Sequence, residues 1–133
     1  MRYGNHPAVI GWQIDNEPGH YGVVDYSENA QAKFRIWLQK KYGTIDKLND
    51  TWGASFWSET YQNFEQVRLP NQQEVPDKAN PHAMLDLNRF MADELAGFVN
   101  MQADILRRHI HKDQWITTNL IPIFNPVDPV RID

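Results

Sequence analysis

The sequence predicts an α/β protein, in the form of one segment of a larger parallel sheet. Residues 8–14 form an almost wholly apolar run, as in a short buried strand, and residues 114–121 are predicted to form a second strand. Between them lie an amphipathic helical segment, an irregular aromatic-rich stretch and a longer helical segment. A strand, a helical crossover and a parallel strand form the elementary unit of α/β folds. Because two strands alone make a poor sheet, we expect the chain to be a slice of a larger protein.

The first strand is expected over Ala8–Ile14, which is apolar at almost every position. Such a run is typical of a parallel strand that is covered on both faces, so Trp12 is expected in the core. The strand ends in the polar run of residues 15–19, whose proline and glycine indicate a loop.

Two helices are expected next. Ser27 is a suitable N-cap for a helix that runs to about Tyr42, and Gly43 suits the left-handed position after its end. Thr44 then caps a second helix, which Gly53 ends. Side chains at helical spacing predict the inner face of the first helix: Ala30, Phe34, Trp37, Leu38 and Lys41, with Trp37 expected in the core.

An irregular excursion is expected over residues 54–80, and it contains Phe56, Trp57, Tyr61 and Phe64. Connections of this length are uncommon in compact domains and are often functional.

The last helix is expected to start at Asn80-Pro81, an N-cap followed by proline in the first turn, and to reach His109 or beyond. Its predicted apolar face consists of Leu87, Met91, Leu95, Phe98, Met101 and Ile105. The second strand, Gln114–Ile121, and a proline-containing tail follow.

The composition excludes several classes of protein. The formal charge is −4 and the basic residues form no stripe, which argues against a nucleic-acid partner. The absence of cysteine excludes disulfides and cysteine metal sites. No apolar run approaches the roughly 20 residues of a membrane helix. The first residues lack the apolar core of a signal peptide, so a cytoplasmic protein is expected.

Glu17 is the candidate catalytic residue. It follows Asn16 at the carboxyl end of the first expected strand. In β/α barrels the active site is built at that end of the strands, and glycosidases place two carboxyls across the scissile bond. A glutamate after a strand is, by itself, more often a solvated loop residue, so both interpretations stay open at this point.

Longer blocks of sequence bear on the choice between these two interpretations of Glu17. The chain resembles glycoside hydrolase family forty-two, the bacterial β-galactosidases, in blocks that follow the family order and span nearly the whole chain. They are residues 2–4, 6–17, 34–38, 41–49, 51–53, 56–58, 86–90 and 117–119.

The resemblance implies a retaining β-galactosidase with an eight-stranded β/α barrel of the TIM type. Residues 1–133 would form part of that catalytic domain, roughly from strand four to strand five, with the aromatic excursion inserted. Glu17 would be the acid/base, and Asn16 would bind the sugar near its 2-hydroxyl. Trp57 resembles the aromatic wall of the galactose site, with a core position as the alternative. Asn119, at the end of the second strand, is a candidate substrate contact.

Two departures from the family pattern shape the remaining expectations. Many members carry a cysteine cluster with zinc after the Asn-Glu pair, whereas this chain offers His20 and Asp25 there. No structural zinc and no cofactor are therefore expected, and His109 and His111 are expected at the surface. The family's nucleophile, a glutamate on a later strand, has no counterpart in these 133 residues, so the isolated chain is expected to be inactive.

Other interpretations stay open beside this one. The strand-end Asn-Glu pair is widespread among retaining barrel glycosidases, so a related enzyme could act on another sugar, although the longer blocks favour a β-galactoside. A binding module could keep the aromatic loop without chemistry. Apolar surfaces exposed by a truncation could also drive self-association.

Overall fold

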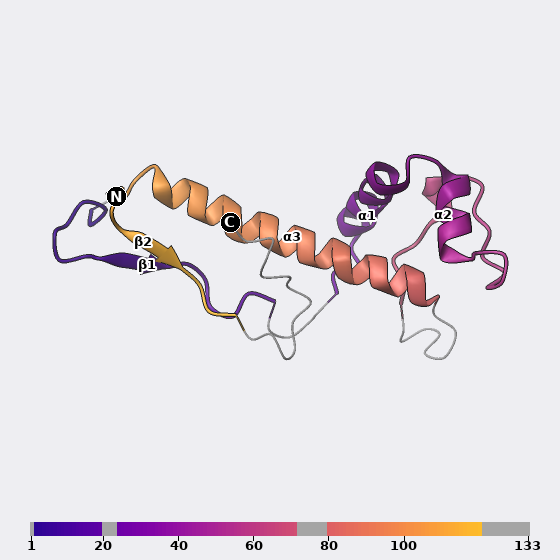
Figure 1. Ribbon diagram of the computed structural model, residues 1–133, viewed down its shortest axis with the longest axis horizontal. Coiled ribbons are helices and arrows are strands. Elements are labelled where there is room, and N and C mark those ends of the chain that lie inside the picture. Colours follow the sequence, from indigo (N-terminus) through magenta and orange to yellow (C-terminus); the bar gives the residue numbers. More distant parts are fainter. Residues whose placement is uncertain (1, 20–23, 72–79, 121–133) are drawn as a thin grey trace. The chain divides into compact units, whose positions relative to one another are not determined.

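The computed structural model describes residues 2–19, 24–71 and 80–120 (Figure 1). The elements are, in order, β1 (Gly11–Gln13), α1 (Glu28–Tyr42), α2 (Ile45–Trp52), the 3-10 helix η1 (Phe64–Gln66), α3 (Pro81–Arg107) and β2 (Trp115–Thr117). The expected order of strand, helices, excursion, long helix and strand is confirmed. The chain divides into two compact units, which we call the strand unit (Met1–Val23 with Met91–Asp133) and the helical unit (Val24–Phe90).

The strand unit contains a parallel pair, with Trp12 of β1 opposite Ile116 of β2 (Figure 1). Both strands are shorter than the sequence predicts, because the paired register covers three residues on each side. Val9 still donates its N–H to the carbonyl of His6 at 3.0 Å, as in a turn, and Asp15 has a φ of 56°, which ends the extended backbone. Ile121, the predicted end of the second strand, and the proline-containing tail lie outside the described residues.

Burial of the strand pair on both faces is not observed. Ile10 is 71% exposed and Trp115 is 50% exposed. Trp12 is half-buried, and its indole N–H donates to Gln114 Oε1 at 3.1 Å. A strand is covered on both faces only when other layers pack against it, and the sequence of the strand cannot show whether this chain supplies those layers.

Position 11 of β1 must be a glycine because of Trp115, its partner on β2. A Cβ atom added there would overlap the indole ring of Trp115. The large side chain of β2 therefore occupies the space that a side chain of β1 would otherwise fill.

The apolar face predicted for α3 is confirmed at Leu87, which is buried, and is wrong at three positions nearer the end of the helix. Phe98, Met101 and Ile105 are 48%, 49% and 47% exposed. The buried side chains of this part of the helix are mostly small: Ala92, Ala96, Val99 and Leu106. The prediction followed the bulkiest residues, whereas small residues allow a helix backbone to approach its neighbours closely. α3 ends at Arg107, and its guanidinium donates to the carbonyl of Gln114 at 2.6 Å, just before β2.

Local capping explains the bounds of α1 and α2 in the helical unit. The hydroxyl of Ser27 accepts the N–H of Ala30 at 3.2 Å, and Thr44 Oγ1 accepts the N–H of Lys47 at 3.3 Å. Gly43 and Gly53, with φ of 76° and 59°, follow the ends of the two helices. These caps are confirmed at the predicted positions, because capping depends on residues close in sequence.

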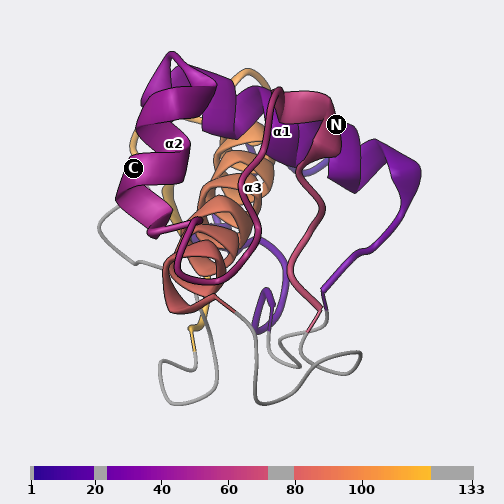
Figure 2. The same cartoon turned by 90° about the vertical axis from the view of Figure 1, so that its right-hand side faces the viewer.

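The core of the helical unit lies between α1, α2 and the segment around η1. Its largest fully buried side chains include Phe34, Leu38, Leu48, Trp52 and Val67. Figure 2 shows α1 and α2 as neighbouring helices joined by a tight turn. Gln31 and Arg35 of α1 both donate to the carbonyl of Val67, at 3.1 and 2.9 Å, and so hold the excursion against the helix.

Trp37 of α1 is half-buried rather than fully buried. Its ring stacks on Phe34 with centroids 6.3 Å apart and meets the edge of Phe90 at 6.3 Å. The ammonium of Lys41 lies 4.9 Å from the Trp37 ring centroid, a cation–π arrangement. Trp37 therefore packs with Phe34 and Phe90 at the edge of the core.

No described helix has the length and apolar character needed to span a membrane.

Candidate active site

Glu17 lies where the chain leaves the carboxyl end of β1. The N–H of Ile14 still donates to the carbonyl of Thr117 at 2.9 Å, which extends the pairing one step beyond the strand. After that point Asp15 and Glu17 both adopt left-handed backbone conformations, with φ of 56° and 49°. Such conformations are uncommon for residues other than glycine and usually cost about 1 kcal/mol or more. Glu17 is half-buried and lies in the turn after the strand end.

Asn119 joins this turn to the end of β2. Its side-chain Oδ1 accepts the backbone N–H of Glu17 at 3.1 Å. The same oxygen accepts a hydrogen bond from Gln13 Nε2 at 3.0 Å, and Gln13 also reaches the carbonyl of Asp15 at 3.3 Å. The structure therefore brings Glu17 and Asn119 together at one end of the strand pair.

The carboxylate of Asp15 accepts two further hydrogen bonds at this turn. Its Oδ1 accepts the backbone N–H of Asn16 at 2.8 Å, and its Oδ2 accepts a hydrogen bond from Gln102 Nε2 of α3 at 3.4 Å. Asn16 itself is exposed, next to Glu17. Sequence reasoning did not single out Gln13, Asp15 or Gln102, although the first two flank the Asn-Glu pair within four residues.

Trp57 belongs to the helical unit. It is half-buried and meets the 82% exposed Phe56 edge to face, with ring centroids 5.2 Å apart. The next residue, Ser58, has a left-handed φ of 56°. Burial raises the pKa of Glu59, and burial together with the Glu59 charge raises the pKa of Tyr61 to about 12. Trp57 thus lies in a tightly turned segment, outside the fully buried core.

The histidines that the structure describes belong to no metal site. Among the described residues there is no group of three or more His, Cys, Asp or Glu side chains that could hold a metal ion. His20 lies outside the described residues, so the expectation of no structural zinc stays a prediction. His109 and His111 are exposed, as predicted, although both follow α3 instead of lying on it.

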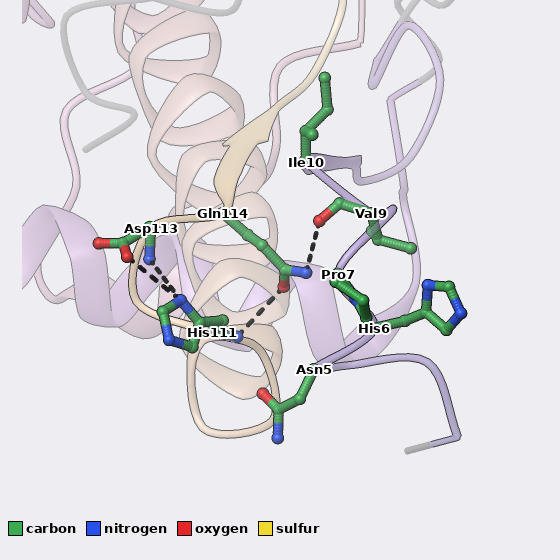
Figure 3. A pocket seen from close by; sticks show the side chains of 8 residues that line it. All are labelled: Asn5, His6, Pro7, Val9, Ile10, His111, Asp113 and Gln114. Atoms are coloured by element: carbon green, nitrogen blue, oxygen red, sulfur yellow. Dashed lines mark hydrogen bonds and ion pairs between the residues drawn. The ribbon is translucent and has the colours of Figure 1, made fainter.

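A pocket of about 410 Å³ lies at the opposite, amino-terminal end of the strand pair (Figure 3). It is lined by Asn5, His6, Pro7, Val9, Ile10, His111, Asp113 and Gln114. Gln114 Nε2 donates to the carbonyl of Val9 at 2.8 Å, and His111 Nδ1 lies 3.4 Å from Asp113 Oδ2 (Figure 3). In β/α barrels this end of the strands serves stability rather than catalysis. Glu17 and Asn119 lie at the other end.

A buried carboxylate in the helical unit was also missed by sequence reasoning. Asp86 is 1% exposed, and its oxygens accept hydrogen bonds from Lys41 Nζ, the Tyr42 hydroxyl and Trp52 Nε1. Burial alone would raise the pKa of Asp86, but these hydrogen bonds outweigh burial and hold it below its ordinary value. Burial and the Asp86 carboxylate raise the pKa of Tyr42 to about 12. The partners lie 34 to 45 residues away in sequence, so no local pattern indicates them.

Comparison with known proteins decides the family. Residues 1–133 match the family model described as Beta-galactosidase, glycoside hydrolase family forty-two. The chain belongs to this β-galactosidase family. The β-galactosidase BgaA of Thermus sp is 42% identical over 128 residues, which cover 96% of this chain and 19% of that protein. The β-galactosidase LacZ of Heyndrickxia coagulans is 39% identical over 127 residues, again 96% of this chain and 19% of the relative.

Solved structures of β-galactosidases agree with the sequence comparison. The enzyme of the psychrophilic Marinomonas ef1 superposes with a TM-score of 0.87 and 42% identity, over 98% of this chain and 20% of that one. The enzyme of the haloarchaeon Halorubrum lacusprofundi gives a TM-score of 0.86 and 34% identity, over 98% and 19%. The family resemblance seen in the sequence is confirmed. This β-galactosidase family chain spans about a fifth of the length of the relatives it matches.

Proposed function

We propose that these residues act as a segment of a retaining β-galactosidase, in which Glu17 is the acid/base. The observation that carries the proposal is the position of Glu17. It lies in the turn that follows β1, beside the end of the parallel strand β2, in a chain of the β-galactosidase family. The carboxyl ends of parallel strands in β/α barrels are where catalytic side chains are placed. We assign β1 and β2 to the fourth and fifth strands of such a barrel.

In this proposal Glu17 carries out two proton transfers. As an acid, it protonates the glycosidic oxygen while a second carboxylate attacks the anomeric carbon and the aglycone leaves. As a base, it then removes a proton from the water that hydrolyses the galactosyl-enzyme intermediate. Asn16, exposed beside Glu17, binds the sugar near its 2-hydroxyl, where contacts strengthen in the transition state. Trp57 supplies an aromatic face for the galactose ring.

The second carboxylate, in this proposal, comes from outside the 133 residues. Retaining glycosidases hold their two carboxyls about 5–5.5 Å apart, one on each side of the anomeric carbon. With one of the two, the chain has a proton donor but no nucleophile. We therefore assign the activity to the complete barrel enzyme and not to the isolated chain.

Replacing Glu17 by glutamine in the complete enzyme tests the proposal. General acid catalysis contributes roughly 10²–10⁴-fold, and a poor leaving group depends on it most. We expect Glu17→Gln to lower kcat/KM for lactose by about 10³-fold, and kcat/KM for 2,4-dinitrophenyl β-galactoside by less than about tenfold.

Glu28→Gln is the matched control, because Glu28 is an exposed glutamate on α1. It should leave both values within about twofold of the original, since exposed substitutions away from special features have small effects. Equal losses on both substrates with Glu17→Gln would argue against the acid role.

A further inference from the structure

One side-chain oxygen connects the proposed acid/base to the neighbouring strand. Asn119 Oδ1 accepts the Glu17 N–H at 3.1 Å and Gln13 Nε2 at 3.0 Å. Asn119 follows β2, Gln13 is the last residue of β1, and Glu17 is in the turn after β1. Both described bonds of this oxygen are thus directed at the strand end that carries Glu17, and not away from it.

The hydrogen bond to the Glu17 N–H stabilises an unfavourable backbone conformation. The pairing of β1 with β2 continues to the Ile14 N–H, and beyond it Asp15 and Glu17 both have left-handed backbone conformations. Left-handed backbone is retained only where the surrounding structure determines it. A hydrogen bond to the Glu17 N–H acts on the same residue whose Cβ sets the direction of the carboxyl.

We propose that Asn119 is a positioning residue for Glu17, a role that rests on the proposed function. By fixing the Glu17 amide relative to β2, Asn119 sets where the carboxyl meets the glycosidic oxygen. Gln13 supports the role, because its amide holds the Asn119 carboxamide in the orientation that presents Oδ1 to the turn. This differs from the direct substrate contact that the sequence suggested for Asn119.

The two roles predict different kinetics. A misplaced acid slows the reactions that need protonation of the leaving group, whereas a lost sugar contact affects every galactoside alike. Displacing a catalytic group by about 1 Å costs on the order of 10²-fold in rate. In the complete enzyme we therefore expect Asn119→Ala to lower kcat/KM for lactose by about 30- to 100-fold. For 2,4-dinitrophenyl β-galactoside the loss should be less than about threefold, because that aglycone leaves with little protonation.

Three further variants sharpen the test. Asn119→Asp keeps an oxygen that accepts both hydrogen bonds, so it should restore the ratio of the two kcat/KM values to within about fivefold of the original. Asn29→Ala removes the same atoms from an exposed position of α1 and should leave the ratio unchanged. Gln13→Ala frees the Asn119 carboxamide to rotate, so it should change the ratio in the same direction and by less.

The outcomes separate the alternatives. Equal losses on both substrates, with a higher KM, would show a sugar contact and overturn the proposal. A loss that follows thermal stability, with an unchanged ratio in folded enzyme, would also overturn it. If Asn119→Ala does not fold, the ratio in Gln13→Ala decides, and an unchanged ratio rejects positioning. Glu17→Gln in the same assay tests the proposed function separately, because its ratio must change even if Asn119 has no role.

Discussion

The carboxylate of Asp86 accepts hydrogen bonds from Lys41 and Tyr42 of α1 and from Trp52 of α2. Asp86 itself is on α3, so one buried charge links three helices within the helical unit. A buried ion is stabilising only while its partners remain in place, and removing one partner leaves an expensive unpaired group. Because the described hydrogen-bond partners of Asp86 are side chains of the same helical unit, we interpret Asp86 as a structural residue and not as a second catalytic carboxyl.

We expect Asp86→Asn to destabilise the helical unit by about 2–4 kcal/mol at pH 7, because the charge-assisted hydrogen bonds are lost. The folded pKa of Asp86 is depressed, so its stabilisation is present above the unfolded pKa of about 3.9 and is lost as the pH falls through the folded pKa. The difference between variant and original should therefore shrink at acidic pH. Urea unfolding followed by circular dichroism at pH 7 and pH 3 measures both differences.

Asp50→Asn, an exposed aspartate of α2, is the control and should change the unfolding free energy by no more than about 0.5 kcal/mol. A pH-independent difference for Asp86→Asn would contradict the role of its charge.

Individual site residues were predictable only where a local pattern marks them. The position of Glu17 after β1 could be predicted because an apolar run precedes it, and its catalytic role stays a proposal. The hydrogen bond between Glu17 and Asn119 spans 102 residues, so its existence depends on the parallel pairing of β1 and β2. The sequence placed Asn119 at the correct strand end, and the structure was needed to show which atom it contacts.

At the level of the elements, the start of α3 combines two functions in Asn80. Its Oδ1 accepts the N–H groups of His82 and Ala83 at 3.0 and 3.4 Å, and its Nδ2 donates to the carbonyl of Trp52 at 2.9 Å. Asn80 is 3% exposed, so these bonds are made away from water. The cap therefore also attaches the end of α2 to the beginning of α3.

We expect Asn80→Ala to cost about 2–3 kcal/mol, the sum of a lost cap and a buried carbonyl left without its donor. Thr44→Ala, at the exposed cap of α2, loses only the cap bond and should cost about 1 kcal/mol. Asn80→Asp keeps the acceptor and should lie between the two. Urea unfolding free energies of the three variants check this order, and equal costs for Asn80→Ala and Thr44→Ala would contradict the second function.

The elements differ in how well the sequence predicts them. The bounds of α1 and α2 follow from Ser27, Thr44 and the glycines after them, which act within one helical turn. The buried face of α3 and the coverage of β1 depend on what packs against them. Counting bulky residues therefore selected Phe98 and Met101, while Ala96 and Val99 are the buried ones.

On the scale of the whole molecule, the chain contains half of the proposed catalytic pair. We expect the pure 133-residue chain to release no nitrophenol from nitrophenyl β-galactoside above the rate of the buffer, because the proposed function places the attacking carboxylate outside these residues. A colorimetric assay of the chain beside the complete enzyme measures this. Release that stays proportional to the amount of chain through a further purification step would contradict the expectation, whereas release that separates from the chain comes from a contaminant.

Several large apolar side chains of the strand unit are exposed, among them Ile10, Phe98, Met101 and Trp115. Contiguous apolar surface favours contact with other protein surfaces. Self-association of the isolated chain thus stays a prediction, as does binding of a galactoside without turnover.

Gly11 also matters for how well the two strands stay aligned. The Trp115 indole occupies the place of the missing side chain, so a larger residue at position 11 would push the strands apart or slide one along the other. Only two residues separate this point from Ile14, the last backbone tie before the turn that carries Glu17. A misfit at the beginning of β1 would shift the end of the same short strand, so the direction of the Glu17 carboxyl, the proposed proton donor, would depend on the absence of a side chain at position 11.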